Sequence, residues 1–343
     1  MGRQRGGGHG RGARQAPHGR AGGGGRNLPG PTRTVRPRSA NLRALAPRPP
    51  VPQPAVVRTV PEMQALADGV RQSGGTLALV PTMGALHAGH LALVDAARER
   101  ADHVTVSVFV NPTQFAPGED YEAYPRTLDA DLAALAGRAD AVFAPAAHAM
   151  YPFGLPPYAT VSVRELDRHL CGASRPGHFQ GVTTVVTKLF LACRPHVAVF
   201  GEKDAQQLAI VRRMTAELGF GVEVVGHPVV REPDGLAMSS RNRYLGADER
   251  RQAVVLSQAL GAARAAVAAG ERDAAALTEA MRAHVETAPL AEVDYAEVVD
   301  ADALQPAAAL DPQGPSGGRY LAALAVRFGD TRLIDNTTLV VGE

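Results

Sequence analysis

The sequence contains no tryptophan and only two cysteines, Cys171 and Cys193, among its 343 residues. Two cysteines are too few for a disulfide scaffold, and no histidines are spaced beside them as zinc ligands, so we expect reduced thiols. No apolar run approaches the ~20 residues that a membrane-spanning helix needs. The arginines near the amino terminus are not followed by an apolar segment, which argues against a secretory signal. These absences predict a cytoplasmic globular protein.

Lysine is scarce too, since Lys188 and Lys203 are the only two. Arginine can serve most surface roles of lysine, so each remaining lysine is a candidate for function. Acidic residues are absent from residues 1–50, which carry eleven arginines. The rest of the chain has 25 Lys or Arg against 34 Asp or Glu, so the body of the protein is acidic.

The amino-terminal segment, residues 1–55, consists largely of Gly, Arg and Pro. Such a composition cannot bury enough apolar surface to offset chain entropy, so it predicts a disordered tail. Arg-Gly repeats can bind RNA loosely through charge and stacking, which is the one nucleic-acid contact that the sequence suggests. The interpretation that we favour is an extended amino terminus without such a role.

Strand and helix patterns alternate from residue 56 to about residue 230. Strands are predicted at residues 77–80, 104–110, 141–143, 197–200 and 222–225. Helices are predicted at residues 61–66, 91–98, 127–136, 182–192 and 205–218, with Thr59 as a cap for the first. This alternation predicts an α/β fold with a mostly parallel, doubly wound sheet and right-handed crossovers.

The pattern changes after Val230. A polar loop at residues 231–243 precedes two long alanine-rich helices, which begin near Ala247 and Arg272. Short β-rich runs follow at residues 295–299, 322–328 and 333–341. The sequence therefore predicts a catalytic domain at 56–230 and a smaller α+β domain at 231–343.

Residues 80–90 carry the most informative motif, because a short buried strand turns into a helix there. The turn places His87 and His90 three residues apart with a glycine between them. Ligands bind at the carboxyl ends of parallel strands, and the free N–H groups of a helix start favour phosphate. Imidazoles at such a place can donate hydrogen bonds to a phosphoryl group. From this turn alone, a phosphate site and an ordinary glycine-containing turn are equally supported.

Two further polar segments are expected near this turn. Residues 201–204 follow a strand, and residues 238–241 lie in the loop at the domain junction. They would add the point charge of Lys203, an acid, and a mobile Ser-Ser-Arg clamp, which together with the histidines suit nucleotidyl transfer. The plainer alternatives are a surface ion pair between Lys203 and Asp204 and a solvated loop.

Three uncharged or weakly basic side chains are further candidates. Gln207 lies four residues after Lys203 on a predicted helix, so both can face one crevice. Gln114 lies in a loop after a strand, and His178 is a weaker candidate that is more often structural. The chain has no Gly-x-Gly-x-x-Gly after its first strand and no Walker loop, so neither standard phosphate fingerprint applies.

Five motifs, in this order, strongly resemble the pantothenate synthetase family. They are PTMGALHAGH (81–90), FVNPTQF (109–115), YPR (124–126), FGEKD (200–204) and MSSRNRY (238–244). The resemblance covers the chain from about residue 56 to its end. It implies a Rossmann-like nucleotidyltransferase domain with a smaller domain, a homodimer, and Mg²⁺-dependent use of ATP. The implied reaction joins pantoate and β-alanine through a pantoyl adenylate, giving pantothenate, AMP and pyrophosphate.

The resemblance also implies roles for individual residues. His90, as proton donor, His87 and Lys203 would be catalytic. The implied ATP-binding residues are Met83, Gly84, Ala85, Leu86, His87, Ala88, Gly89, His90, Gly201, Glu202, Lys203, Asp204, Val230, Met238, Ser239, Ser240 and Arg241. Gln114 and Gln207 would bind pantoate, and no metal ligand can be named.

Two positions depart from the family pattern. Ala205 stands where a tyrosine is common, and Thr113 stands where Met or Leu is common. Both are neighbours of the implied pantoate ligands, so we expect weaker pantoate binding than in a relative with the bulkier residues.

Other functions remain open at this point. A related histidine-turn nucleotidyltransferase would leave its nucleotide on the product and would release no amide. A class I aminoacyl-tRNA synthetase uses a similar turn, but the acidic body argues against tRNA. A non-enzymatic RNA-binding role would depend on the tail, and deletion of residues 1–55 would abolish it while a ligase stayed active.

Overall fold

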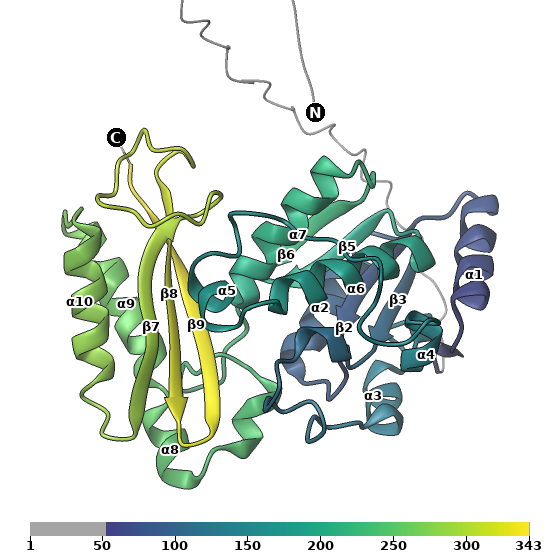
Figure 1. Cartoon of the computed structure of the whole chain (residues 1–343), viewed down its shortest axis with the longest axis horizontal. Coiled ribbons are helices and arrows are strands. Elements are labelled where there is room, and N and C mark those ends of the chain that lie inside the picture. The colour runs from purple at the N-terminus through teal and green to yellow at the C-terminus, as the bar shows by residue number, and fades with distance from the viewer. Residues whose placement is uncertain (1–52, 343) are drawn as a thin grey trace, which may run out of the picture. The chain divides into compact units, whose positions relative to one another are not determined.

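The computed structural model describes residues 53–342, so almost the whole predicted tail lies outside the described residues. Six strands form the larger sheet in the order β1-β4-β3-β2-β5-β6 (Figure 1). They are β1 (Ala55–Val57), β2 (Leu77–Thr82), β3 (His103–Val108), β4 (Ala141–Phe143), β5 (Val197–Gly201) and β6 (Glu223–His227). Every pairing is parallel, which confirms the predicted sheet. The short edge strand β1 was not predicted.

Helices cover both faces of this sheet, as a doubly wound fold requires. One face packs against α1 (Val60–Gln72), α6 (His178–Cys193) and α7 (Ala205–Glu217). The other packs against α2 (Ala88–Arg98) and α3 (Leu128–Leu135). Along β2, Leu77 and Leu79 face the first layer and Ala78 and Val80 the second, which explains why residues 77–80 are all apolar.

The smaller sheet is antiparallel, with the order β7-β8-β9 (Figure 1). Its strands are β7 (Ala291–Asp300), β8 (Arg319–Phe328) and β9 (Thr331–Val340). Alternate residues of β8 pack against α9 (Val255–Ala268) and α10 (Ala274–Val285). The residues between them join the core that also contains Phe200 of β5. The second sheet is thus held to the first by apolar packing, and the division into domains near residue 230 stays a prediction.

Several element boundaries differ from the predictions. Helix α6 begins at His178 and not at Val182, because Gly177 takes the left-handed φ of 83° that starts it. The first alanine-rich helix is two helices, α8 (Ala247–Gln252) and α9, separated by a short turn. The short helices α4 (Ala147–Met150) and α5 (Leu170–Ser174) were not predicted. The cap of α1 by Thr59 is confirmed.

No helix within residues 53–342 is both long enough and apolar enough to cross a membrane. Both cysteines are free and buried.

Candidate functional site

The order of the strands brings the predicted motifs together. Strand β2 lies between β3 and β5, so the turns that follow these three strands meet at one edge of the sheet. The turn after β3 is the short helix η1 (Pro112–Gln114), and the turn after β5 is η2 (Glu202–Asp204). Two adjoining cavities of about 180 and 170 Å³ open at this edge. His90, Asp204 and Gln207 line both of them.

The larger of these, the acid cavity, combines apolar and polar side chains. Its lining includes Phe109, Val182, Val185, Val186, Leu189 and Phe200, together with the amides of Asn111, Gln114 and Gln207. The other is the phosphate cavity. Of the residues predicted to bind ATP, it is lined by Met83, His87, Gly89, His90, Gly201, Lys203, Asp204, Val230, Met238, Ser239, Ser240 and Arg241.

Five residues of the predicted ATP set do not line the phosphate cavity: Gly84, Ala85, Leu86, Ala88 and Glu202. Gly84 and Ala85 are buried in the turn, and Ala88 is exposed. The backbone N–H groups of Ala85 and Leu86 donate to a carboxylate of the protein, so they are already committed. Glu202 faces a different groove, between α7 and the smaller sheet. Direct contact of these five with ATP stays a prediction.

Hydrogen bonds determine which ring nitrogen is protonated in each of the two histidines of the turn. The backbone N–H of Gly89 donates to Nδ1 of His87 over 3.1 Å, and the N–H of His87 donates to Nδ1 of His90 over 3.3 Å. A nitrogen that accepts a hydrogen bond carries no proton, so each neutral ring is protonated at Nε2. The ring centroids lie 4.0 Å apart. The turn therefore presents two adjacent Nε2–H donors to the phosphate cavity.

Both rings are neutral at pH 7. Burial, followed by the charges of Lys203 and Arg243, lowers the pKa of His87 from 6.5 to about 4. Burial, followed by the neighbouring His87 and Lys203, lowers the pKa of His90 to about 3. An incoming phosphate would replace this unfavourable environment with a negative charge. The rings thus serve as hydrogen-bond donors without carrying a full charge in the free protein.

The free energy of unfolding is expected to fall as pH decreases from about 6.5 to about 4. In the unfolded chain His87, His90 and His178 titrate near 6.5, whereas in the folded protein burial lowers their pKa values to about 4, 3 and 4. The unfolded chain therefore binds more protons across this window, so the full stability is present above pH 6.5 and is lost below it. Each neutral histidine contributes a slope of up to about 1.4 kcal/mol per pH unit.

Urea denaturation at pH 7.5, 6.0 and 5.0 measures this slope. His90→Gln removes one titrating ring and should flatten it, whereas His148→Gln, at an exposed histidine, should not. Equal stability of the wild-type protein at pH 7.5 and 5.0 would contradict the expectation.

A buried carboxylate holds the histidine turn in shape. Asp131 on α3 is 2% exposed and accepts hydrogen bonds from the N–H groups of Ala85, over 3.1 Å, and Leu86, over 2.8 Å. The hydroxyl of Thr127 donates to the same carboxylate over 3.3 Å. These bonds stabilise Ala85 at φ 51°, a left-handed conformation that is unfavourable for a residue with a Cβ atom. Sequence reasoning missed Asp131, which lies more than 40 residues from the turn.

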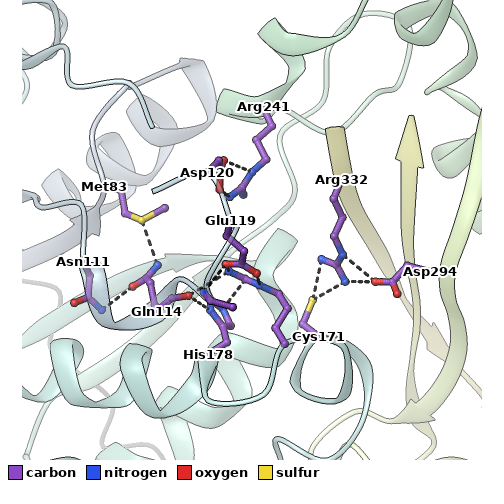
Figure 2. A network of polar contacts seen from close by, with 12 residues as sticks. Met83, Asn111, Gln114, Glu119, Asp120, Cys171, His178, Arg241, Asp294 and Arg332 are labelled. Atoms are coloured by element: carbon purple, nitrogen blue, oxygen red, sulfur yellow. Dashed lines mark hydrogen bonds and ion pairs between the residues drawn. The ribbon is translucent and has the colours of Figure 1, made fainter. Parts of the chain in front are cut away.

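The amide of Gln114 is positioned by a chain of polar contacts (Figure 2). Asn111 Nδ2 donates to Gln114 Oε1 over 3.0 Å, and Gln114 Nε2 donates to the sulfur of Met83 over 3.2 Å. The Oδ1 atom of Asn111 accepts from Tyr151 and from Thr113. The side chain of Gln207, in contrast, makes no hydrogen bond with any other residue of 53–342, and the residue lines the acid cavity. One amide is therefore fixed and the other is available to a ligand.

His178 supports this site with both ring nitrogens. Arg175 Nη1 lies 3.0 Å from Nε2 of His178, and since arginine can only donate, that nitrogen accepts. The remaining Nδ1–H then donates to the carbonyl oxygen of Gln114 over 2.8 Å. Burial, followed by the charge of Arg175, lowers the pKa of His178 to about 4, which agrees with a neutral ring. This residue holds the Gln114 turn in place.

Two arginines of the site are paired with carboxylates of one loop (Figure 2). Arg175 donates to both oxygens of Glu119 over 2.7 and 2.6 Å. Arg241 donates to both oxygens of Asp120 over 3.0 and 2.9 Å, and burial is outweighed by this pair, so the pKa of Arg241 is raised. The hydroxyl groups of Tyr124 and Ser240 are 3.3 Å apart. Residues 119–124 thus lie against residues 240–241, far from them in sequence.

Lys203 is held by its backbone and turned toward the phosphate cavity. Asn336 Nδ2 on β9 donates to the carbonyl oxygens of Glu202, over 3.0 Å, and Lys203, over 2.7 Å. The Nζ atom is 3.5 Å from the carboxylate of Asp204, and the Lys203 side chain is 21% exposed. The ion pair is therefore long and partly buried, which leaves the ammonium able to bind an incoming anion.

A third, smaller cavity of about 80 Å³ adjoins the same residues on the side of the smaller sheet. Ala205 lines it, with Cys171, Tyr295 and Arg332. The guanidinium of Arg332 lies 3.6 Å from the sulfur of Cys171 and donates to Asp294 over 2.6 Å (Figure 2). The small side chain of Ala205 therefore borders a hollow beside the reaction site.

Comparison with known proteins decides the family. A family model described as pantoate-beta-alanine ligase matches residues 55–338. A pantothenate synthetase of Salinibacter ruber is 59% identical over 292 residues, which cover 83% of this chain and 98% of that protein. The chain belongs to the pantoate-beta-alanine ligase family.

Further members of the pantoate-beta-alanine ligase family agree with this result. A pantothenate synthetase of Geobacter sulfurreducens is 51% identical, over 83% of this chain and 98% of its own. The crystal structure of pantothenate synthetase from Thermus thermophilus is 45% identical, with a TM-score of 0.75, and covers 82% and 98% of the two chains. The pantoate-beta-alanine ligase of Francisella tularensis, in a complex with beta-gamma ATP and beta-alanine, is 30% identical with a TM-score of 0.67 over 83% and 97%.

Proposed function

We propose that the protein condenses pantoate with β-alanine, using ATP, through a pantoyl adenylate. The single observation that carries this proposal is that two cavities with different side chains adjoin at one edge of the sheet. The phosphate cavity offers the Nε2–H groups of His87 and His90 and the ammonium of Lys203. The adjoining acid cavity offers apolar walls and two amides. Membership of the ligase family supports the same reaction.

The acid cavity suits the chemistry of pantoate. Its dimethyl carbon would pack against the valine face of α6, at Val182, Val185 and Val186. Its hydroxyl and carboxylate groups would bind the amides of Gln114 and Gln207, of which the latter has no partner among residues 53–342. Uncharged amides can both donate and accept, so they match a small hydroxy acid.

The proposed chemistry has two steps. A carboxylate oxygen of pantoate attacks the α-phosphorus of ATP, the bond to the bridging oxygen breaks, and pyrophosphate leaves. His87, His90 and Lys203 would stabilise the charge that grows on the phosphoryl oxygens during this step. The amine of β-alanine then attacks the acyl carbon, loses a proton and displaces AMP. We propose His90 as the proton donor to the phosphates, through its Nε2–H group.

Mg²⁺ is part of this proposal, and the residues present fit it. Within residues 53–342 no group of three or more His, Cys, Asp or Glu side chains could hold a metal by itself. Mg²⁺ bound with a nucleotide usually takes one or two carboxylates and the phosphates, and Asp204 lines the phosphate cavity. When bound, the ion would neutralise phosphate charge. A homodimer is a further proposal that rests on the family resemblance, and a cytoplasmic location is one that rests on the sequence.

The proposed function is tested by AMP release from the purified protein with ATP and Mg²⁺. Pantoate and β-alanine are added singly and together, and pantothenate is quantified. We expect AMP and pantothenate in equal amounts only when both acids are present. A stable nucleotidyl product without an amide would favour the related nucleotidyltransferase instead.

Ala205→Tyr is expected to tighten pantoate binding. Tyrosine would fill part of the 80 Å³ cavity that Ala205 lines and would pack behind Gln207, which lines the same cavity. Titration calorimetry with pantoate and an ATP analogue measures the change, and Ala133→Tyr, at an exposed position of α3 that lines none of these cavities, is the control. Equal pantoate affinity in Ala205→Tyr and the wild-type protein would sink the idea.

A further inference from the structure

A groove of about 670 Å³ lies beside the reaction cavities, between the two sheets, and shares Pro228 and Val229 with the phosphate cavity. Its walls come from α7, α9, the segment that follows β6, and β9, the edge strand of the smaller sheet that lies toward the larger one (Figure 1). Its volume falls within the range of small-molecule sites, about 300–1,000 Å³. Neither His87, His90, Gln114 nor Gln207 lines it.

The lining of this arginine groove is strongly basic. It contains five arginines, Arg212, Arg213, Arg231, Arg264 and Arg319, and two carboxylates, those of Glu202 and Asp302. The chain outside residues 1–50 has 34 acidic residues against 25 Lys or Arg, so a cluster of arginines around one hollow departs from the acidic body. Guanidinium groups bind phosphate bidentately and are more weakly hydrated than ammonium groups.

The arginines differ in the number and kind of partners that they have within the protein. Arg264 on α9 is exposed and has no polar partner among residues 53–342. Arg212 on α7 donates only to the carbonyl oxygen of Val224, over 3.4 Å. Neither guanidinium therefore forms an ion pair with a carboxylate in the described part of the chain.

Two other arginines make exposed pairs that an anion can replace. Arg213 is 3.7 Å from Glu217, and the Arg319 side chain, 50% exposed, pairs with Asp302. Exposed pairs of this kind contribute about 0–1 kcal/mol. Arg231 differs, because it binds Asp335, whose side chain is 1% exposed, and so belongs to the protein framework. Four guanidinium groups are thus available to a ligand.

We propose that the arginine groove binds a small molecule with two or more phosphate groups, at a site separate from the ATP site. Four arginines exceed what one phosphate needs, since a single bidentate pair satisfies two of its oxygens. Thr337 and Thr338 of β9 line the same groove. This proposal does not depend on the ligase activity.

The groove also borders the reaction site through one turn. Glu202 lines the groove, its neighbour Lys203 lines the phosphate cavity, and Asn336 donates to the carbonyl oxygens of both. Asn336 itself lies on the groove wall. A ligand of the groove would therefore contact the residue that holds the Lys203 turn.

Titration calorimetry with inorganic tripolyphosphate on the full-length protein tests the proposal. The wild-type protein should bind two equivalents per chain, one in the ATP site and one in the arginine groove. Lys203→Ala should weaken the first and leave the second. The double variant R212E/R264E should weaken the second at least tenfold and leave the first, and R212Q/R264Q should have a smaller effect in the same direction. Inorganic orthophosphate should bind the groove more weakly than tripolyphosphate.

Arg327→Glu is the matched control, because Arg327 is exposed near the other end of β8 from Arg319, about 26 Å along the strand. Circular dichroism and thermal melting establish that each variant is folded. Binding of a single equivalent that Lys203→Ala abolishes would overturn the proposal, as would unchanged binding in both groove variants. Failure of AMP release, measured separately, would bear on the ligase function and not on this groove.

Discussion

His90→Ala is expected to lower kcat by a factor on the order of 10²–10³, which is the usual loss when one donor to a developing charge is removed. The N–H of His87 donates to Nδ1 of His90, so the neutral ring carries its one proton at Nε2. His90 lines the phosphate cavity. That proton can strengthen its hydrogen bond as negative charge grows on the phosphoryl group. Alanine offers no donor at this point.

The kinetic pattern separates a lost transition-state contact from a lost binding contact. If the Nε2–H acts mainly in the transition state, kcat and kcat/KM fall by the same factor and KM for ATP changes little. His148→Ala, at an exposed histidine outside both cavities, should leave all constants unchanged. A loss of less than tenfold in kcat for folded His90→Ala would contradict the role proposed for this ring.

The parts of the site that could be predicted from sequence are those whose residues lie close together in the chain. The apolar run of β2, the glycine and the two histidines of its turn, and the start of α2 lie within fifteen residues, so local rules place them together. The alternation of strands and helices predicts parallel order, and this puts the turns after β2 and β5 at the same sheet edge. The structure confirms that adjacency.

The contacts that could not be predicted join segments far apart in the chain. The Arg241 pair with Asp120 spans 121 positions, and neither residue carries a local signal for it. The same holds for Asn336, which reaches the Glu202 and Lys203 carbonyls from the second sheet. Sequence spacing also does not predict that Glu202 lines a different groove from its neighbour Lys203, since consecutive residues of a tight turn point in different directions. These details depend on tertiary packing, which a local pattern does not encode.

The start of α6 shows a different limit. The predicted helix starts at residue 182, and several of the residues just before it are polar. In the structure these residues form the first turn of α6, and this turn faces the site. His178, for example, donates to the carbonyl oxygen of Gln114. Gly181 packs so closely on the Thr113 backbone that a Cβ atom would lie 2.2 Å from its carbonyl oxygen. The start of α6 therefore lacks the apolar periodicity of a buried helix, because its residues contact the Gln114 turn.

Asp131→Ala is expected to reduce both stability and activity, although Asp131 touches neither cavity. The buried N–H groups of Ala85 and Leu86 would lose their acceptor, at about 1–3 kcal/mol for each unpaired group. Without these bonds the left-handed φ of Ala85 is no longer supported, and the turn can relax away from the geometry that aims both histidines. Urea denaturation measures the first effect and kcat the second.

Two variants separate the role of the carboxylate in this result from a general effect of charge near the start of α3. Asp131→Asn keeps one acceptor oxygen, so its losses should lie between those of the wild-type protein and Asp131→Ala. Asp129→Ala removes an exposed carboxylate from the same first helical turn and should change stability by less than about 1 kcal/mol and kcat hardly at all. If Asp131→Ala lost stability but kept the wild-type kcat, contacts within α2 alone would be sufficient to orient the two histidine rings. A joint loss, graded from Asp129→Ala through Asp131→Asn to Asp131→Ala, would make Asp131 the residue that positions the histidine pair.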